Sequence, residues 1–337
     1  MKSSLALIAL AVSLCPAAFG QSKPLVRTHT IPTTLTFDSN PSYALPTACD
    51  DKGRSYVKLI EPDGKMTGPV RVSDKGVIEA QFDTTQTLDN TFAVRPDSGI
   101  AAVHRDGKTD VIDNFAPDGA RGSQVRLETP PVPFFPMQIA VFPSGGFFLA
   151  GQPYRQGYEN PSAAVYDAEG HLIKQLNWKG TQDTRQAING TDDKAVVVSK
   201  LARRSVAITG DDGNVYFMRA VSPPSVDVIS STGEIVRKLV VKGPTGANWP
   251  DFGLRVVKNK LLVEFLDGCE DPTEISSCHG TLYTVVDATS GERIADFEAD
   301  QGARGPLACY FSDPDRVYTF SIQPERHRLD IIETVPR

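Results

Sequence analysis

Beyond its first 20 residues the chain has no long hydrophobic run, which excludes a protein that crosses a membrane several times. It also lacks an excess of positive charge, because 35 Lys and Arg are outnumbered by 41 Asp and Glu and the net charge is −6. Binding to phosphate backbones needs clustered Lys and Arg, so no nucleic-acid partner is expected. Apolar residues do not repeat at helical spacing over any sustained stretch. The composition is that of an ordinary globular protein, and the missing helical pattern favours strands.

The N-terminus has the three parts of an export signal. Lys2 precedes ten apolar residues at 5–14, and the small residues of 18–20 precede Gln21. A run of ten apolar residues is too short to span a bilayer and is typical of a cleaved signal peptide. A lipid anchor on Cys15 is the alternative, disfavoured because the residue before it is a leucine. We therefore expect cleavage after residue 20 and export to a periplasm or beyond.

Few cysteines remain once the predicted signal is removed, and their number is even. They are Cys49, Cys269, Cys278 and Cys309. In an oxidising compartment an even number of cysteines favours disulfides over thiols. Cys269 and Cys278 bracket a short polar loop that a disulfide could close, and their spacing does not fit a structural zinc site.

The main pattern is a repeated hairpin: an alternating run of strand-forming residues, a polar turn ending in glycine, and a second alternating run. Glycine supplies the positive φ that such tight turns require. The five copies are 69–82, 109–127, 163–176, 226–239 and 284–297, with turn glycines Gly76, Gly119, Gly170, Gly233 and Gly291. These glycines are separated by 43, 51, 63 and 58 residues.

A second hairpin precedes each of the later copies. These hairpins lie at 92–107, 138–151, 205–220 and 254–266, and a further one lies at 308–323. Two hairpins make a four-stranded unit, and such units repeated every 40–60 residues are typical of propeller blades.

Dividing the 317 residues that follow the predicted signal by a repeat of about 54 predicts six blades. The sixth repeat ends after its third strand, so we expect Leu25–Pro32 to supply the fourth and close the ring. This closure makes Cys49 and Cys309 neighbours, and a disulfide between them is then plausible. An additional strand-like run at 195–200 leaves five or seven blades open.

The predicted fold is therefore all-β, a six-bladed β-propeller with four-stranded antiparallel blades, formed by a single domain at 21–337. Strand pairs such as GGFFLAG with AAVYDAEGHLI, and GNVYFMRA with VDVISSTGEI, resemble bacterial six-bladed propellers of the NHL and TolB-like type. That group contains enzymes and protein binders, so the resemblance implies a fold and little chemistry.

Catalytic and metal-binding motifs are scarce. The five histidines lack HExxH spacing, and no GxSxG elbow or P-loop lysine occurs. His104 and His171 are placed at or beside hairpin turns, which predicts surface histidines rather than a metal site. Calcium-dependent lactonases are also six-bladed, but the acidic stretch of Asp267, Glu270, Asp271 and Glu274 does not match their ligand pattern.

Long aromatic loops are the remaining candidate for function. In a propeller, loops from an outer strand to the next inner strand, and from a second strand to a third, form one variable face. Such loops lie here at 130–135, 152–160, 243–250 and 269–278. The candidate ligand-binding residues are Tyr154, Arg155, Tyr158, Trp249 and Arg304. The alternative for Phe134, Phe135 and Trp249 is packing between blades.

From these observations we favour a binding scaffold over an enzyme. We expect an exported monomer without a cofactor or a membrane span, whose loop-rich face binds a protein, peptide or glycan. The alternative is a calcium-dependent lactonase-like hydrolase with its site in the central channel. A sensor module has less support.

Overall fold

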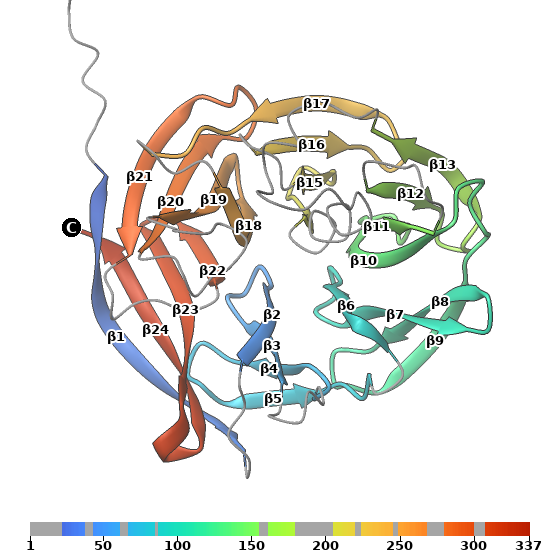
Figure 1. Ribbon diagram of the computed structural model, residues 1–337. Helices are drawn as coiled ribbons and strands as arrows, with labels where there is room; N and C mark the ends of the chain where they lie inside the picture. Colours follow the sequence, from blue (N-terminus) through green and yellow to red (C-terminus); the bar gives the residue numbers. More distant parts are fainter. Residues whose placement is uncertain are drawn as a thin grey trace, which may run out of the picture.

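The protein consists almost entirely of β-strands arranged as sheets around a central axis (Figure 1). The computed structural model describes residues 22–37, 43–60, 67–84, 87–154, 161–178, 205–219, 224–244, 249–267, 280–299 and 307–337. Within these ranges no helix combines the length and hydrophobicity needed to cross a membrane. The described residues include a short 3-10 helix, Pro324–Arg326, between β23 and β24.

Four of the sheets each contain four consecutive antiparallel strands. The first sheet contains β2 (Tyr43–Cys49), β3 (Ser55–Ile60), β4 (Val70–Val72) and β5 (Ile78–Gln81). The second contains β6 (Thr87–Val94), β7 (Ile100–Asp106), β8 (Thr109–Phe115) and β9 (Arg121–Arg126). The third contains β10 (Phe134–Val141), β11 (Phe147–Pro153), β12 (Ser162–Tyr166) and β13 (Leu172–Asn177). The fourth contains β14 (Val206–Thr209), β15 (Val215–Arg219), β16 (Ser225–Ile229) and β17 (Ile235–Val240).

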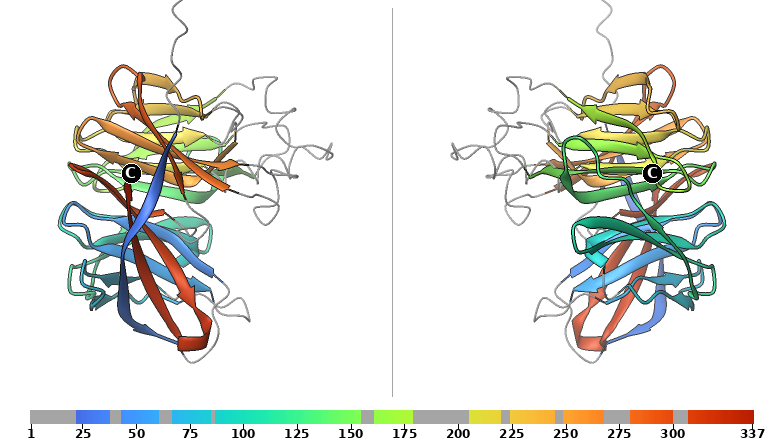
Figure 2. Two further views of the ribbon diagram at one scale, coloured as in Figure 1. Left: turned by 90° about the vertical axis from the view of Figure 1, so that its left-hand side faces the viewer. Right: turned by 90° about the vertical axis from the view of Figure 1, so that its right-hand side faces the viewer.

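The remaining strands form one eight-stranded sheet in the order β18-β19-β20-β21-β1-β24-β23-β22. Its first half is β18 (Trp249–Val257), β19 (Lys260–Asp267), β20 (Gly280–Asp287) and β21 (Arg293–Ala299). Its second half is β1 (Lys23–Thr36), β24 (Arg328–Pro336), β23 (Asp315–Gln323) and β22 (Leu307–Ser312). In the side views, β1 runs along the outside of the ring next to β24 (Figure 2).

The prediction of six separate four-stranded blades is wrong. The described chain has four separate four-stranded sheets and one sheet of eight strands. The cause is β1, which is longer than the predicted Leu25–Pro32 and pairs on both edges. It pairs antiparallel with β24, as expected, and its first residues also pair in parallel with β21, where Lys23 faces Phe297. This second pairing merges two sets of strands into one sheet.

The predicted hairpins are confirmed. The glycines that end their turns all have positive φ: Gly76 (78°), Gly119 (89°), Gly170 (93°), Gly233 (78°) and Gly291 (76°). A side chain is strained in this left-handed region, so glycine is the residue that the turns require. Each of these turns joins the third strand of a four-stranded set to its fourth. The repeated pattern therefore marks the outermost hairpins.

The hydrophobic core lies between neighbouring sheets rather than in one central mass. Between the third and fourth sheets, Phe148 and Phe217 are both fully buried, with ring centroids 5.2 Å apart. Phe134 is 3% exposed and packs between the second and third sheets, as the packing alternative predicts. Burying one such side chain contributes roughly 1.5–3 kcal/mol to the free energy of folding. Because these side chains are buried between sheets, each sheet is stabilised by packing against its neighbours.

A disulfide joins Cys49, the last residue of β2, to Cys309 in β22, with 5.3 Å between the two Cα atoms. This confirms the pairing that ring closure predicts across 260 residues. Cys269 and Cys278, the predicted signal at 1–20 and the additional run at 195–200 lie outside the described residues.

Replacing both Cys49 and Cys309 with alanine should lower the free energy of unfolding by about 2–5 kcal/mol, because this bond restricts a long loop of the unfolded chain. Urea denaturation of the oxidised wild type and the double variant measures the difference. An unchanged midpoint and slope would show that the strand pairing closes the ring without help from the disulfide.

Candidate functional site

A hollow lies between the second and third sheets, where β7 turns into β8 and where β11 ends. Its cavity volume is small, about 30 Å³, and the hollow is partly open to solvent. Its lining residues are Arg105, Lys108, Asp110, Leu127, Glu128, Thr129, Pro130, Pro133, Phe134, Tyr154 and Tyr166. They come from second-to-third strand connections, from the connection between two sheets, and from strand ends. These are the kinds of loop that form the variable face of a propeller.

Arg105 and Tyr154 form the rim of the hollow, one from each sheet. The guanidinium of Arg105 donates a hydrogen bond to the Tyr154 hydroxyl and lies 5.1 Å from the centre of its ring. The Nε atom of Arg105 donates to Asp110 Oδ1 at 2.9 Å. The Tyr154 backbone N–H donates to the carbonyl of Pro133 at 3.1 Å. These contacts hold in place an aromatic ring that is 52% exposed.

The tight turn between β7 and β8 explains why Arg105 and Asp110 meet. Gly107, at φ 63°, and Lys108 form this turn, and Asp106 pairs with Thr109 directly before and after it. Arg105 therefore faces Asp110 across the hairpin. Opposite charges at facing positions attract, so the turn fixes the arginine at the rim.

Two carboxylates line the hollow. Burial raises the pKa of Asp110 above its usual value, and the hydrogen bond and charge of Arg105 oppose part of that shift. Glu128 uses Oε2 to accept the backbone N–H of Leu172 at 2.9 Å. Each carboxylate thus has one protein partner and still lines the open space.

Tyr166 lines the buried part of the hollow. It is the last residue of β12 and is only 2% exposed. Burial raises the pKa of its phenol, and the charges of Asp110 and Glu128 raise it further. This phenol therefore stays protonated at neutral pH and faces the hollow as a hydrogen-bond donor.

Of the candidate residues predicted from the sequence, the structure places Tyr154 at this hollow. Arg155, Tyr158 and Arg304 lie outside the described residues. Trp249 begins β18, where it pairs with Leu266. Arg105, Asp110, Glu128 and Tyr166 were not predicted from the sequence, although the segment RDGKTD at 105–110 indicates a tight turn between opposite charges. Nothing in the sequence connects Tyr166 with that turn.

The prediction that His104 is a surface residue is wrong. It is 7% exposed, and its Nδ1 atom lies 2.8 Å from Oδ2 of the fully buried Asp113. The reason is its place in the middle of the sheet, paired with Val111 in β8. His171 is exposed, as predicted, and lies 3.0 Å from Asp167 in its turn. Within the described residues, no three His, Cys, Asp or Glu side chains are grouped so that they could hold a metal ion.

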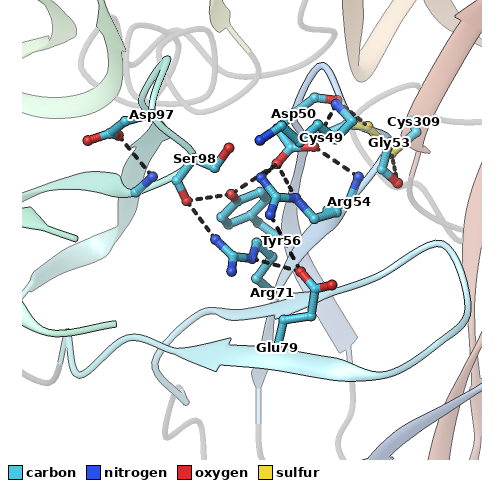
Figure 3. A network of polar contacts seen from close by, with 12 residues as sticks. Cys49, Asp50, Gly53, Arg54, Tyr56, Arg71, Glu79, Asp97, Ser98 and Cys309 are labelled. Carbon is cyan, nitrogen blue, oxygen red and sulfur yellow. Dashed lines mark hydrogen bonds and ion pairs between the residues drawn. A yellow bond between two sulfur atoms is a disulfide. The ribbon is translucent and has the colours of Figure 1, made fainter. Parts of the chain in front are cut away.

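A second polar cluster lies beside the disulfide (Figure 3). Asp50 follows Cys49, and its Oδ1 atom accepts the backbone N–H groups of Lys52 and Arg54, each at 3.0 Å. Its Oδ2 atom accepts from Nε of Arg54 at 2.7 Å. These bonds fix the conformation of the turn at 50–54, which directly follows Cys49 of the disulfide.

The same cluster joins the first sheet to the second (Figure 3). The carbonyl of Ser98, in the turn between β6 and β7, accepts the Tyr56 hydroxyl at 2.7 Å and Nη1 of Arg71 at 3.0 Å. Arg71 also lies 3.2 Å from Glu79. These contacts connect the first sheet to the second beside the disulfide.

No family model and no curated protein matches the chain. Among solved structures, a member of the DUF4221 family from Bacteroides vulgatus ATCC 8482 is similar over 94% of this chain and 99% of its own, with 12% identity and a TM-score of 0.53. A gluconolactonase from Xanthomonas campestris, described as important in glucose secondary metabolic pathways, is similar over 94% of this chain and 99% of its own. Its identity is 10% and its TM-score 0.51.

At these identities the comparisons show the fold alone. The circular arrangement of sheets and the structural likeness together define the chain as a β-propeller. The finer assignment to the NHL and TolB-like type stays a prediction.

Proposed function

We propose that this protein is an exported binding scaffold whose ligand contacts the face around Arg105 and Tyr154. The observation that carries the proposal is the exposed Tyr154 ring, held by Arg105 over the hollow. Tyrosine and arginine are enriched among the residues that dominate binding energies. Holding them in place before binding reduces the entropy lost when a ligand arrives.

The position of the hollow supports the same proposal. Loops vary and carry function, while the sheets that present them are rigid. The rim residues come from two sheets whose shared core includes Phe134, Phe147 and Tyr166, all at most 3% exposed. A ligand at this place would contact a surface that needs little rearrangement. A protein, peptide or glycan fits this description.

Tyr154→Ala should abolish capture of the ligand by immobilised protein from the host's envelope fraction, while leaving the thermal midpoint nearly unchanged. The side chain is half exposed, and surface substitutions typically alter stability by less than 0.5 kcal/mol. Quantitative mass spectrometry of the captured material measures the loss. Val236→Ala, which truncates a residue on β17 that is 54% exposed, is the matched control and should capture as the wild type does. Equal capture by both variants would contradict the proposal.

Export is the second part of the proposal. It is supported by the N-terminal pattern at 1–20 and by the Cys49–Cys309 disulfide, since such bonds persist in oxidising compartments. Protein purified from the producing cells should begin at Gln21. Intact-mass analysis checks this. A chain that begins at Met1, or one that carries lipid on Cys15, would contradict a cleaved signal peptide.

A calcium-dependent hydrolase is the second candidate, favoured by the structural likeness to the Xanthomonas gluconolactonase. The described residues offer little support for a calcium site, because they contain no group of three or more His, Cys, Asp or Glu side chains that could hold an ion. Glu270, Asp271 and Glu274 lie outside the described residues. We therefore keep binding as the proposed function and derive no catalytic step.

Removing divalent ions should leave the thermal midpoint of the protein unchanged if it is a scaffold without a metal. An ion that binds only the folded state, present at 100 times its dissociation constant, would stabilise it by about 2.7 kcal/mol and shift the midpoint by several degrees. Thermal melts in EDTA, and then with calcium restored, measure this. A reversible calcium-dependent shift would favour the hydrolase over the scaffold.

A further inference from the structure

We propose that the outer edge of β17 binds an extended peptide segment with acidic and apolar side chains, which adds to the fourth sheet as a fifth strand. This surface is separate from the hollow at Tyr154, whose lining residues come from the second and third sheets and the connection between them. The inference rests on the open edge of β17, on the composition of that edge, and on the segment that covers the equivalent edge of β21.

The outer edge of β17 is open within the described part of the chain. There β17 pairs with β16 alone, and it lies on the outer rim of the ring (Figure 1). The backbone N–H of Val241, directly after the strand, donates to the carbonyl of Pro224 at 3.0 Å, on the side of β16. Backbone groups alternate in direction along a strand, so those of Val240 and Lys238 point to the open edge. They can bond to one further strand.

The edge of β17 is more apolar than the equivalent edges of the other separate sheets. Its residues Ile235, Val236 and Val240 are 40%, 54% and 55% exposed. The outermost strands β5 and β9 of the first and second sheets have no exposed large hydrophobic side chain, and β13 of the third has only Ile173. Natural proteins usually protect open edges with charged residues, because apolar edges pair with other chains. The apolar edge of β17 is therefore expected where a partner strand binds.

The next set of four strands shows that such an edge accepts an added segment. Lys23–Leu25 of β1 pair in parallel with Phe297–Ala299 of β21, although the two segments are far apart in the sequence. Like β17, β21 is the last of four consecutive strands in its set. Addition of an extended segment to a sheet edge is a common mode of peptide recognition, in which main-chain hydrogen bonds supply affinity. The same mode of pairing is available at β17.

Charge indicates which segment fits. β17 carries Arg237 and Lys238 but no acidic residue. Arg237 donates to the carbonyl of Ala288 at 2.6 Å, so it is held by the neighbouring set of strands. The Lys238 side chain is 57% exposed, and its Nζ atom lies 3.8 Å from the buried Asp227. Lys238 is therefore the positive charge that an added strand would meet.

The strand geometry places that charge beside an apolar side chain. Lys238 and Val240 are two residues apart, so their side chains lie on the same face of the strand. An added strand would place one side chain opposite each of them, and the favourable choices are an acidic residue opposite Lys238 and an apolar one opposite Val240. A second copy of β17 would instead bring four basic side chains together, which disfavours self-pairing.

The experiment measures binding of the fluorescently labelled peptide TVEVVEVT to the mature protein by fluorescence polarisation. Its sequence reads the same in both directions, so a glutamate can face Lys238 and a valine Val240 in a parallel or an antiparallel strand. Saturable binding is expected. The peptide TVKVVKVT, in which lysines replace the glutamates, should bind about tenfold more weakly, because like charges then face each other.

Two variants test the charge and the backbone pairing separately. Lys238→Glu should reverse the preference, so that the lysine peptide binds more tightly than the glutamate peptide, a result that misfolding would not produce. Val240→Pro removes an N–H that points to the open edge and keeps those that point to β16, so it should abolish binding of both peptides. Thermal melts show whether each variant is folded.

Arg126→Glu is the matched control. Arg126 ends β9, the outermost strand of the second sheet, and its side chain is 67% exposed. The change in charge equals that of Lys238→Glu but lies on another sheet, so the peptide affinity should stay at the wild-type value. Tyr154→Ala should also leave it unchanged. Val236 lies at a bulge outside the stretch that would pair with the peptide, so it remains a suitable control for the ligand of Tyr154.

The proposal would be overturned by the absence of saturable binding of the glutamate peptide, by equal affinity for both peptides, or by binding that Val240→Pro leaves unchanged. Sedimentation velocity tests the second copy as occupant. A dimer that Val240→Pro dissociates would show that β17 pairs with itself, and the peptide assignment would then be wrong. Capture that depends on Tyr154 is a separate measurement, so the proposed function can stand or fail independently of this edge.

Discussion

The structure depends on the pairing of the N-terminal strand with the end of the chain. β1 pairs with β24 from Leu25, opposite Pro336, to Thr36, opposite Arg328, and its first residues also pair with β21. A ring of sheets without this strand would leave unpaired edges, which are prone to aggregation. The disulfide between Cys49 and Cys309 lies at the same closure and joins β2 to β22. The two connections differ in kind, because one consists of backbone hydrogen bonds and the other is covalent.

Ring closure matters for the hollow because the hollow lies between sheets. Arg105 belongs to the second sheet and Tyr154 follows the last strand position of β11 in the third, so their contact depends on the spacing of the two sheets. That spacing is set by the apolar side chains packed below, among them Phe134 and Phe147. If the ring opened, the second and third sheets could separate. The contact between Arg105 and Tyr154 would then be lost without any substitution in the site itself.

The sequence reveals local features more readily than partners in space. Turn glycines such as Gly119 are visible because a positive φ restricts the residue type. The disulfide could be predicted because closing the ring brings residues 49 and 309 together. The parallel pairing of β1 with β21 could not, since alternation indicates a strand but not which outer edge it meets. His104 was misplaced for a similar reason: being near a turn in sequence says little about burial within a sheet.

Buried carboxylates show how structural polar groups differ from those of the proposed site. Asp113 and Asp227 each precede the last residue of a third strand by two positions and are fully buried. Arg121 and Gln124 donate to the first, and Trp178 and Arg219 donate to the second, so both carboxylates are held by donors within the fold. Asp110 has a different environment, because Arg105 holds it while it still lines the hollow. Sequence alone does not separate these aspartates. The distinction lies in whether nearby side chains supply further donors, as they do for Asp113 and Asp227, or leave an open space, as they do beside Asp110.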